Sequence, residues 1–268
     1  MSHARLPAGD NPPSVGVASH VGRVRASNED SARAEGTVFV VADGMGGHAA
    51  GEIASQLATE ALAELAGRRD LEVTDIVAQV GEANRRILES AADHPAQAGM
   101  GTTLTGVAGV IVGGLPHWAV FNVGDSRVYR SVDGSLSQVT VDHSEVQELV
   151  DRGYLTVEQA ARHPARNIIT RSLGRESMGA VDTWVFPPQA GERLVICSDG
   201  LSNELSLEEI EAVVTSTDDA QEAASTLVER AVEAGGRDNV TAIVIVMPAT
   251  QHAGVEGPEE ATPEARPS

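Results

Sequence analysis

Several aspartates in this sequence stand where an apolar segment begins or ends, a position in which a carboxylate is a candidate for binding a cation. The set is Asp30, Asp43, Asp125, Asp199 and Asp238. Asp43 and Asp199 are the clearest cases, because each follows an apolar run and is itself followed by glycine. A fold that gathered these acids would bring like charges together at a cost unless cations lay among them. The pattern therefore predicts a metal site.

The ligand type restricts the choice of metal. The chain has one cysteine, Cys197, so a cysteine-rich zinc site is excluded. Oxygen ligands suit magnesium, manganese or calcium. The acids are far apart in the sequence and no EF-hand loop is present. This favours a catalytic pair of metals about 3.5–4 Å apart, where a shared water is deprotonated and attacks phosphorus in line.

The Asp43-Gly44 pair could instead be an ordinary turn. The same dipeptide at Asp133-Gly134 lies between two short alternating segments, which predicts a hairpin. Asp43-Gly44 differs because further glycines and a helical pattern follow it. We therefore interpret Asp133-Gly134 as structural and Asp43-Gly44 as functional.

Composition excludes several classes of function. The formal charge of −20 argues against nucleic acid or an anionic membrane as the main partner. All 19 basic residues are arginine, which excludes Walker-type loops and Schiff-base chemistry because both need a lysine. A single cysteine precludes an internal disulfide and favours a cytoplasmic setting. No apolar run resembles a signal peptide or is long enough to cross a bilayer, so we expect no membrane insertion.

Hydrophobic periodicity predicts one α+β domain over residues 15–247, with a flexible arm at 1–14 and a disordered tail at 248–268. We expect strands over 15–19, 38–42, 102–112, 118–123, 126–131, 135–139, 181–186, 193–198 and 240–247. Helices are predicted from about residue 49, over 72–92, and in two segments between 207 and 231. Asp142 and Glu145 resemble a capping box that opens a further helix.

The segment 153–178 is irregular and rich in arginine. In so acidic a chain it is a candidate for contacting an anionic substrate. A solvated loop paired with local acids explains the same pattern equally well.

Taken in order, short motifs make the sequence recognisable: Arg25 with Asn28-Glu29-Asp30, Asp43-Gly44-Met45-Gly46-Gly47-His48, Gly101-Thr102-Thr103, Gly124-Asp125-Ser126-Arg127, Asp142-His143-Ser144, Ser198-Asp199-Gly200 and Asp238-Asn239-Val240-Thr241. The chain resembles the metal-dependent serine/threonine protein phosphatases of the protein phosphatase 2C family, in particular the compact bacterial members. The resemblance implies an antiparallel two-sheet β-sandwich flanked by helices on both sides.

The resemblance also implies roles for individual residues. Asp43 would bridge two Mn²⁺ or Mg²⁺ ions, and Gly44 would offer its carbonyl to one of them. Asp199 and Asp238 would hold one ion, and Asp30, with Glu29 acting through a water, would hold the other. Asp125 would help Asp199 to bind a weaker third metal. Arg25 would clamp the substrate phosphate, which suits the paired donors of a guanidinium.

Two further interpretations concern the proton donor and the thiol. Animal members of the family carry a histidine directly after the Asp-Gly pair, where it is a proposed general acid for the leaving alkoxide; here that position is Met45. His48, three residues on, could act as this general acid or could pack locally. Cys197 is interpreted as a core residue, since Asn203 stands where a cysteine phosphatase would carry arginine. The Thr102-Thr103 and Asp142-His143 pairs are expected to be structural.

By this resemblance the chain hydrolyses phosphoserine and phosphothreonine through direct attack of a metal-bridging hydroxide, as a monomer. Its expected partners are phosphorylated proteins, including the serine/threonine kinases that it would counteract. The alternatives are a dedicated regulator of an anti-anti-sigma-type protein, a catalytically dead phosphoprotein binder, and a calcium-binding protein without activity. Intact acids at every matching position argue against the dead binder.

Overall fold

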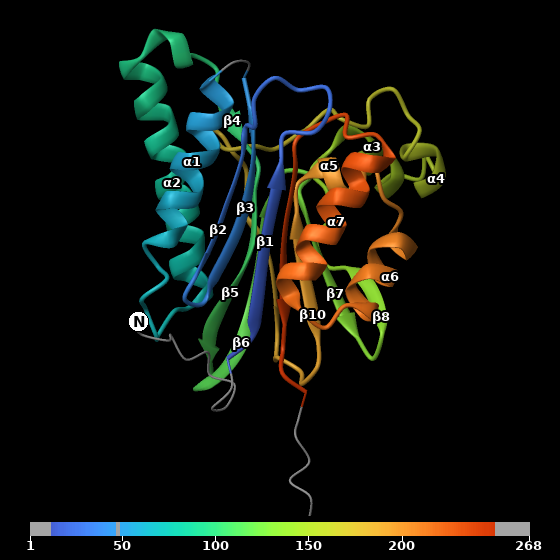
Figure 1. The fold of residues 1–268 in the computed structure, drawn as a ribbon. Helices are drawn as coiled ribbons and strands as arrows, with labels where there is room; N and C mark the ends of the chain where they lie inside the picture. Colours follow the sequence, from blue (N-terminus) through green and yellow to red (C-terminus); the bar gives the residue numbers. More distant parts are fainter. Residues whose placement is uncertain (1–11, 47–48, 250–268) are drawn as a thin grey trace, which may run out of the picture.

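The computed structural model describes residues 12–46 and 49–249. Two antiparallel sheets lie face to face between two layers of helices (Figure 1). The first sheet has the order β1 (Ser14–His20), β11 (Val240–Val246), β10 (Arg193–Cys197), β7 (Arg127–Val132) and β8 (Ser135–Gln138). The second has the order β2 (Asp30–Glu35), β3 (Val38–Met45), β5 (Leu104–Val112), β6 (Leu115–Val123) and β9 (Asp182–Phe186), with β4 (Gly101–Thr102) paired to the end of β3. This arrangement confirms the predicted fold.

Helices cover the outer face of each sheet (Figure 1). On the second sheet lie α1 (Ala49–Ala63) and α2 (Val73–Asp93), and on the first lie α6 (Leu207–Ser216) and α7 (Ala220–Ala234). Shorter helices occupy the connections: the 3₁₀ helix η1 (Pro95–Gln97), α3 (Glu145–Asp151), α4 (Val157–Ala160) and α5 (Asp199–Ser202). In the part of the chain that the structure describes, no helix combines the length and apolarity needed to span a bilayer.

Strand β3 shows how the layers orient the candidate site. Val38, Val40 and Ala42 pack against the helices, whereas Phe39 and Val41 pack against the other sheet. Because side chains alternate along a strand, Asp43 continues the face that carries Phe39 and Val41. The predicted strand over 38–42 is therefore confirmed; it is buried on both faces, and Asp43 lies on the face between the sheets.

Three local predictions were wrong. Residues 30–35 form strand β2, although their polar sequence carried no strand signal; β2 is an edge strand, so a continuous apolar pattern is not required of it. Asp43 lies within β3, which continues through Gly44 and Met45 because those residues pair with β4. The cap of α3 is Ser144, whose Oγ accepts from the Gln147 amide, while Asp142 binds Arg127 instead.

Other local predictions agree with the structure. Asp133 and Gly134 form the β7–β8 hairpin turn, with φ of 53° and 80°. Residues 1–11 and 250–268, which hold most of the expected arm and tail, lie outside the described residues.

Candidate metal centre

A hollow of about 220 Å³ opens where β3, α5 and the loops before β7 and β11 meet. It is lined by Arg25, Glu29, Asp43, Gly44, Met45, Gly46, Asp125, Asn167, Ile169, Asp199 and Asp238. The predicted acids Asp43, Asp125, Asp199 and Asp238 thus come from distant parts of the sequence and share one cleft. The sequence predicted that the fold would gather these aspartates, and the structure shows these four around one hollow.

Asp30 is placed differently from the other predicted ligands. It is the cross-strand partner of Asp43, but it does not line the hollow. Its Oδ2 instead accepts a hydrogen bond of 2.8 Å from Ser198 Oγ. Of the neighbouring acids Glu29 and Asp30, only Glu29 is part of the lining, while Asp30 lies directly across from Asp43; its role as a ligand stays a prediction.

The backbone of Asp43 is held by two threonines. Its N–H donates to Thr103 Oγ1 at 2.9 Å, and its carbonyl accepts from Thr102 Oγ1 and from the Thr103 amide, both at 2.9 Å. Both threonines are fully buried. They position the acid without lining the cleft, which agrees with the structural role expected for this pair.

Two glycines allow Glu29 to approach the cleft. A Cβ on Gly44 would lie 2.2 Å from the Gly51 carbonyl oxygen and 2.5 Å from that of Glu29. A Cβ on Gly51, in the first turn of α1, would lie 2.0 Å from Glu29 Oε2. Any side chain at either position would displace the backbone or the Glu29 carboxylate. Gly44 and Gly51 are therefore packing requirements of the site.

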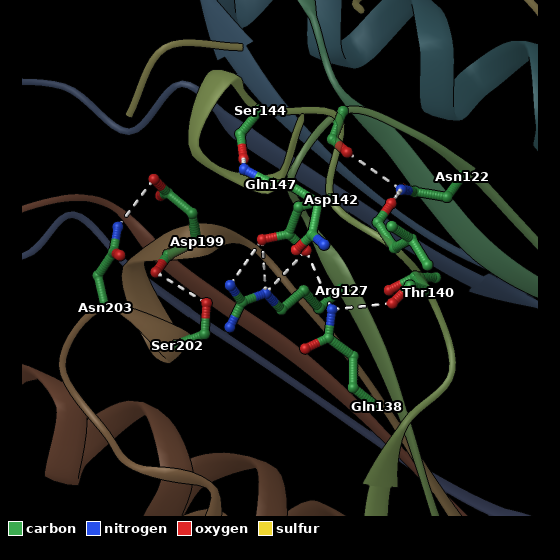
Figure 2. Close-up of polar contacts among 12 residues, drawn as sticks. Asn122, Arg127, Gln138, Thr140, Asp142, Ser144, Gln147, Asp199, Ser202 and Asn203 are labelled. Carbon is green, nitrogen blue, oxygen red and sulfur yellow. Dashed lines mark hydrogen bonds and ion pairs between the residues drawn. The ribbon is translucent and has the colours of Figure 1, made fainter. Parts of the chain in front are cut away.

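Asp199 begins the short helix α5 and is held from within it. Asn203 Nδ2 donates to Asp199 Oδ2 at 2.9 Å (Figure 2). Beside it, the guanidinium of Arg127 binds the Asp142 carboxylate through both Nε and Nη2, with a shortest distance of 2.6 Å (Figure 2). Arg127 is the first residue of β7, so this ion pair joins the start of the strand that follows Asp125 to the loop that carries Asp142.

Asp238 joins two loops of the site. Its Oδ2 lies 2.7 Å from Arg25 Nη2, and the Arg25 side chain is 53% exposed at the cleft mouth. The next residue, Asn239, is buried; its Oδ1 accepts from the Glu29 amide at 2.8 Å, and its Nδ2 donates to the carbonyls of Val21 and Ser27 at 2.9 Å. One amide side chain thus fastens the Arg25–Glu29 loop to the Asp238 loop. The sequence analysis missed this role, although Asn239 directly follows a predicted ligand.

Burial and mutual repulsion raise the pKa values of the clustered acids. Burial, opposed by hydrogen bonds from Thr241 and Ser198, raises the pKa of Asp30 to about 7. Burial and the charge of Asp199 raise the pKa of Asp125 to about 8. Burial first, and neighbouring aspartates second, also raise the pKa values of Asp43 and Asp199. Such a cluster is unstable as a set of anions unless positive charge is supplied.

The donor set fits divalent cations. One buried carboxylate oxygen on each of Asp30, Asp125 and Asp199 has no hydrogen-bond partner among the described residues. Buried polar atoms are normally paired, so these oxygens are suited to a ligand that accepts lone pairs. Among the described residues, however, no three acidic, histidine or cysteine side chains already converge into a metal cage. The individual ligand roles therefore stay predictions.

The remaining sequence-based candidates lie as follows. Met45 lines the cleft, whereas His48 lies outside the described residues. Cys197 is fully buried in the core, where burial raises the pKa of its thiol to about 12, so it is inert as a nucleophile. The segment 153–178 does contact the cleft, but through Asn167 and Ile169; none of its arginines is part of the lining.

Comparison with known proteins identifies the class. A sequence profile of the family described as Protein phosphatase 2C matches residues 19–234. The serine/threonine phosphatase stp of Listeria welshimeri is 36% identical over 236 residues, which cover 84% of this chain and 92% of that protein. The serine/threonine protein phosphatase PstP of Mycobacterium tuberculosis is 43% identical over 229 residues, 83% of this chain but 43% of that longer protein.

Solved structures agree with the sequence comparison. The crystal structure of the Mycobacterium tuberculosis phosphatase PstP/Ppp superposes with a TM-score of 0.80 at 40% identity, covering 89% of this chain and all of that one. The PstP catalytic domain in complex with two manganese ions has a TM-score of 0.80 at 38% identity, covering 88% of this chain and 99% of that one. The chain therefore belongs to the protein phosphatase 2C family. It is a metal-dependent phosphoprotein phosphatase of the bacterial type, as the sequence motifs predicted.

Proposed function

We propose that this cleft hydrolyses phosphoserine and phosphothreonine in proteins with two Mn²⁺ or Mg²⁺ ions held by Asp43, Asp199, Asp238 and the Gly44 carbonyl. The observation that carries the proposal is the gathering of four aspartates around one hollow; among the described residues, one buried carboxylate oxygen on each of Asp125 and Asp199 has no hydrogen-bond partner. When bound, the ions supply an activated water and neutralise charge on the phosphate. Without them, the carboxylates would repel a phosphate dianion.

Arg25 is proposed to bind the substrate phosphate. Its guanidinium lines the cleft and is half exposed, and its Nη2 is held by Asp238 at 2.7 Å. That ion pair aims the guanidinium across the hollow, while its other N–H groups can donate to phosphate oxygens. Asp238 would thus serve both a metal and the phosphate clamp.

Glu29 and Asp30 are proposed to act on the second metal to different degrees. Glu29 lines the cleft and would hold the ion through a water, whereas Asp30, whose Oδ1 has no hydrogen-bond partner among the described residues, would be its direct ligand. Asp125 lines the same hollow, is 6% exposed and responds to the charge of Asp199. These features support a weaker third cation between Asp125 and Asp199.

The wider setting is proposed from the family and the composition. Phosphorylated proteins, including bacterial serine/threonine kinases, are the proposed partners. The single buried cysteine is compatible with a reducing cytoplasm. We propose that the chain acts as a monomer.

The test is phosphate release from a phosphothreonine peptide, titrated with manganese and with magnesium, for the wild type, Asp199→Asn and the control Asp70→Asn. The Asp70 side chain is 86% exposed and remote from the cleft lining. Release should rise with metal, vanish with a chelator, fall at least about 100-fold in Asp199→Asn and persist in Asp70→Asn. The proposal would be overturned if the wild type released no phosphate at any metal concentration while calorimetry still showed metal binding. The chain would then be a metal-binding scaffold without activity.

A further inference from the structure

A second, smaller hollow of about 100 Å³ lies next to the metal cleft. Its lining includes Met45, Met100, Ser172, Leu173 and Arg175. Met45 also lines the metal cleft, so one side chain forms part of the wall of both hollows. Residues that flank a phosphoresidue bound in the cleft can therefore reach the second hollow, since successive residues of an extended chain advance by about 3.3 Å.

The walls of this second hollow are held by hydrogen bonds. Leu173 and Thr102 exchange backbone hydrogen bonds of 2.9 and 3.3 Å across one side. On another side, the buried side chain of Asn84 accepts from the amides of Gly174 and Arg175 at 2.7 and 3.3 Å and donates to the Arg175 carbonyl at 3.0 Å. A preformed hollow binds a side chain without the entropic cost of ordering its walls.

Close backbone approach also defines the shape of the hollow. A Cβ on Gly101 would lie 2.8 Å from the Leu173 carbonyl oxygen. Gly174 has φ of +86°, and a Cβ there would lie 2.3 Å from the Met100 carbonyl oxygen. Side chains at these two positions would push the walls apart, so the glycines keep them at the observed separation.

Charge then selects the kind of side chain that the hollow accepts. Within the described residues, the one hydrogen bond made by the exposed Arg175 side chain runs from Nε to Ser172 Oγ, at 2.9 Å. The nearby Arg171 differs, because its guanidinium binds Asp182 at 3.0 Å. Arg175 lines the hollow, and its Nη groups make no hydrogen bond among the described residues; the other lining residues are methionines, glycines, one leucine and Ser172. In a chain with a net charge of −20, such a cation favours a carboxylate.

We propose that this hollow is a substrate subsite, which binds an acidic side chain flanking the phosphoresidue and uses Arg175 to recognise its carboxylate. The inference rests on the proposed phosphatase function and adds a preference in substrate sequence to it. The aliphatic part of a glutamate would pack against Met45, which is only partly buried, while its carboxylate meets the guanidinium.

The test compares phosphothreonine peptides that carry glutamate or glutamine at a single position within two residues of the phosphothreonine. The measured quantity is the ratio of kcat/KM for the glutamate and glutamine peptides of each pair. The variants are Arg175→Gln, which keeps an amide at the mouth of the hollow, and the control Arg162→Gln. Arg162 is an exposed arginine of the same segment and lines neither hollow.

We expect the wild type to prefer glutamate about fivefold at one position, which is the upper end for an ion pair with a solvent-exposed guanidinium. That ratio should fall close to one in Arg175→Gln and persist in Arg162→Gln. Equal rates for every wild-type pair, or a preference that survives Arg175→Gln, would overturn the subsite and leave the phosphatase function intact. A preference lost equally in both variants would also overturn it, because long-range attraction would then be the cause. Failure to hydrolyse any peptide with metal present would instead count against the function on which the subsite rests.

Discussion

Asp30 and Asp43 are cross-strand partners in the β2–β3 pair, and both belong to the face between the two sheets. Like charges directly opposite one another destabilise a sheet, and here burial makes the pairing more costly. Ser198 donates to Asp30, and the Asp43 backbone is held by Thr102 and Thr103. The fold therefore holds two like charges together, and without a bound cation their repulsion opposes folding. We infer that the free energy of unfolding depends on metal binding.

The first prediction concerns the pH dependence of the metal-free protein. Burial raises the folded-state pKa of Asp30 to about 7 and that of Asp125 to about 8, both above the unfolded value near 4. Between about pH 4 and 8 the folded state therefore binds more protons than the unfolded state, so the free energy of unfolding falls as the pH rises. We expect Tm in a chelator to drop by about 5–10 °C from pH 5 to pH 8.

The matched variants are Asp30→Asn, which should flatten part of this slope, and the exposed Asp70→Asn, which should leave it unchanged. Saturating manganese at pH 8 should restore the lost stability, because a ligand that binds only the folded state raises Tm. A metal-free Tm that rises between pH 5 and 8 would contradict the assigned burial of these acids.

The second prediction concerns Asn239. Replacement by alanine removes three hydrogen bonds between the Asp238 loop and the loop that carries Glu29. At about 0.5–1.5 kcal/mol for each bond, the free energy of unfolding should fall by about 2–4 kcal/mol. Manganese affinity should fall about 10- to 100-fold because the two loops are no longer fastened together.

The control for Asn239→Ala is Gln79→Ala on α2. Gln79 Nε2 donates to the Ala61 carbonyl at 2.7 Å, far from the cleft lining. It should lose stability but keep the manganese affinity, as measured by urea unfolding and calorimetry. Equal manganese affinities for the two variants would show that Asn239 contributes only to stability.

The third prediction concerns Gly51. Its Cα faces Glu29 so closely that a Cβ would lie 2.0 Å from Oε2. Gly51→Ala should displace the Glu29 carboxylate and lower metal-dependent phosphate release by about 10- to 100-fold. The matched helix variant Gly81→Ala, where a Cβ meets nothing within 4 Å, should instead gain about 0.5–1 kcal/mol and keep full activity. Full activity in Gly51→Ala would mean that Glu29 has no part in catalysis.

The fourth prediction concerns a buried ion pair remote from the cleft. Glu192 is 1% exposed and accepts hydrogen bonds from Trp118 Nε1 on one sheet and Arg130 Nε on the other, at 2.8 and 2.7 Å. Arg130 also lies over the Phe186 ring, 4.0 Å from its centroid. Glu192→Ala leaves Arg130 without its carboxylate and should cost about 3–5 kcal/mol of unfolding free energy in urea.

Metal affinity should be unchanged in Glu192→Ala at temperatures where the protein stays folded, since none of these residues lines the cleft. A loss of manganese affinity in the folded variant would show that the packing between the sheets is coupled to the site.

Much of the protein was determined by the sequence alone. The continuous apolar run Val38–Ala42 and the apolar periodicity of 72–92 specify buried elements because their side chains must leave water. Asp43, Asp125, Asp199 and Asp238 were predictable as a group because a carboxylate at the end of an apolar strand needs a cation or a donor. The absence of lysine and the single cysteine excluded other chemistries directly.

Only the tertiary structure decided which part of the site each of the neighbouring acids Glu29 and Asp30 contacts. Glu29 and Asp30 are adjacent in sequence and equal in charge, yet Glu29 lines the hollow, whereas Asp30 lies across from Asp43 and accepts a hydrogen bond from Ser198. The polar strand β2 could not be predicted from its sequence either, because it forms by pairing with β3 and its own composition does not favour a strand. Asn239 and Gly51 act through contacts with residues distant in the chain. Such contacts exist only once the fold has brought the partners together, so the local sequence pattern does not predict them.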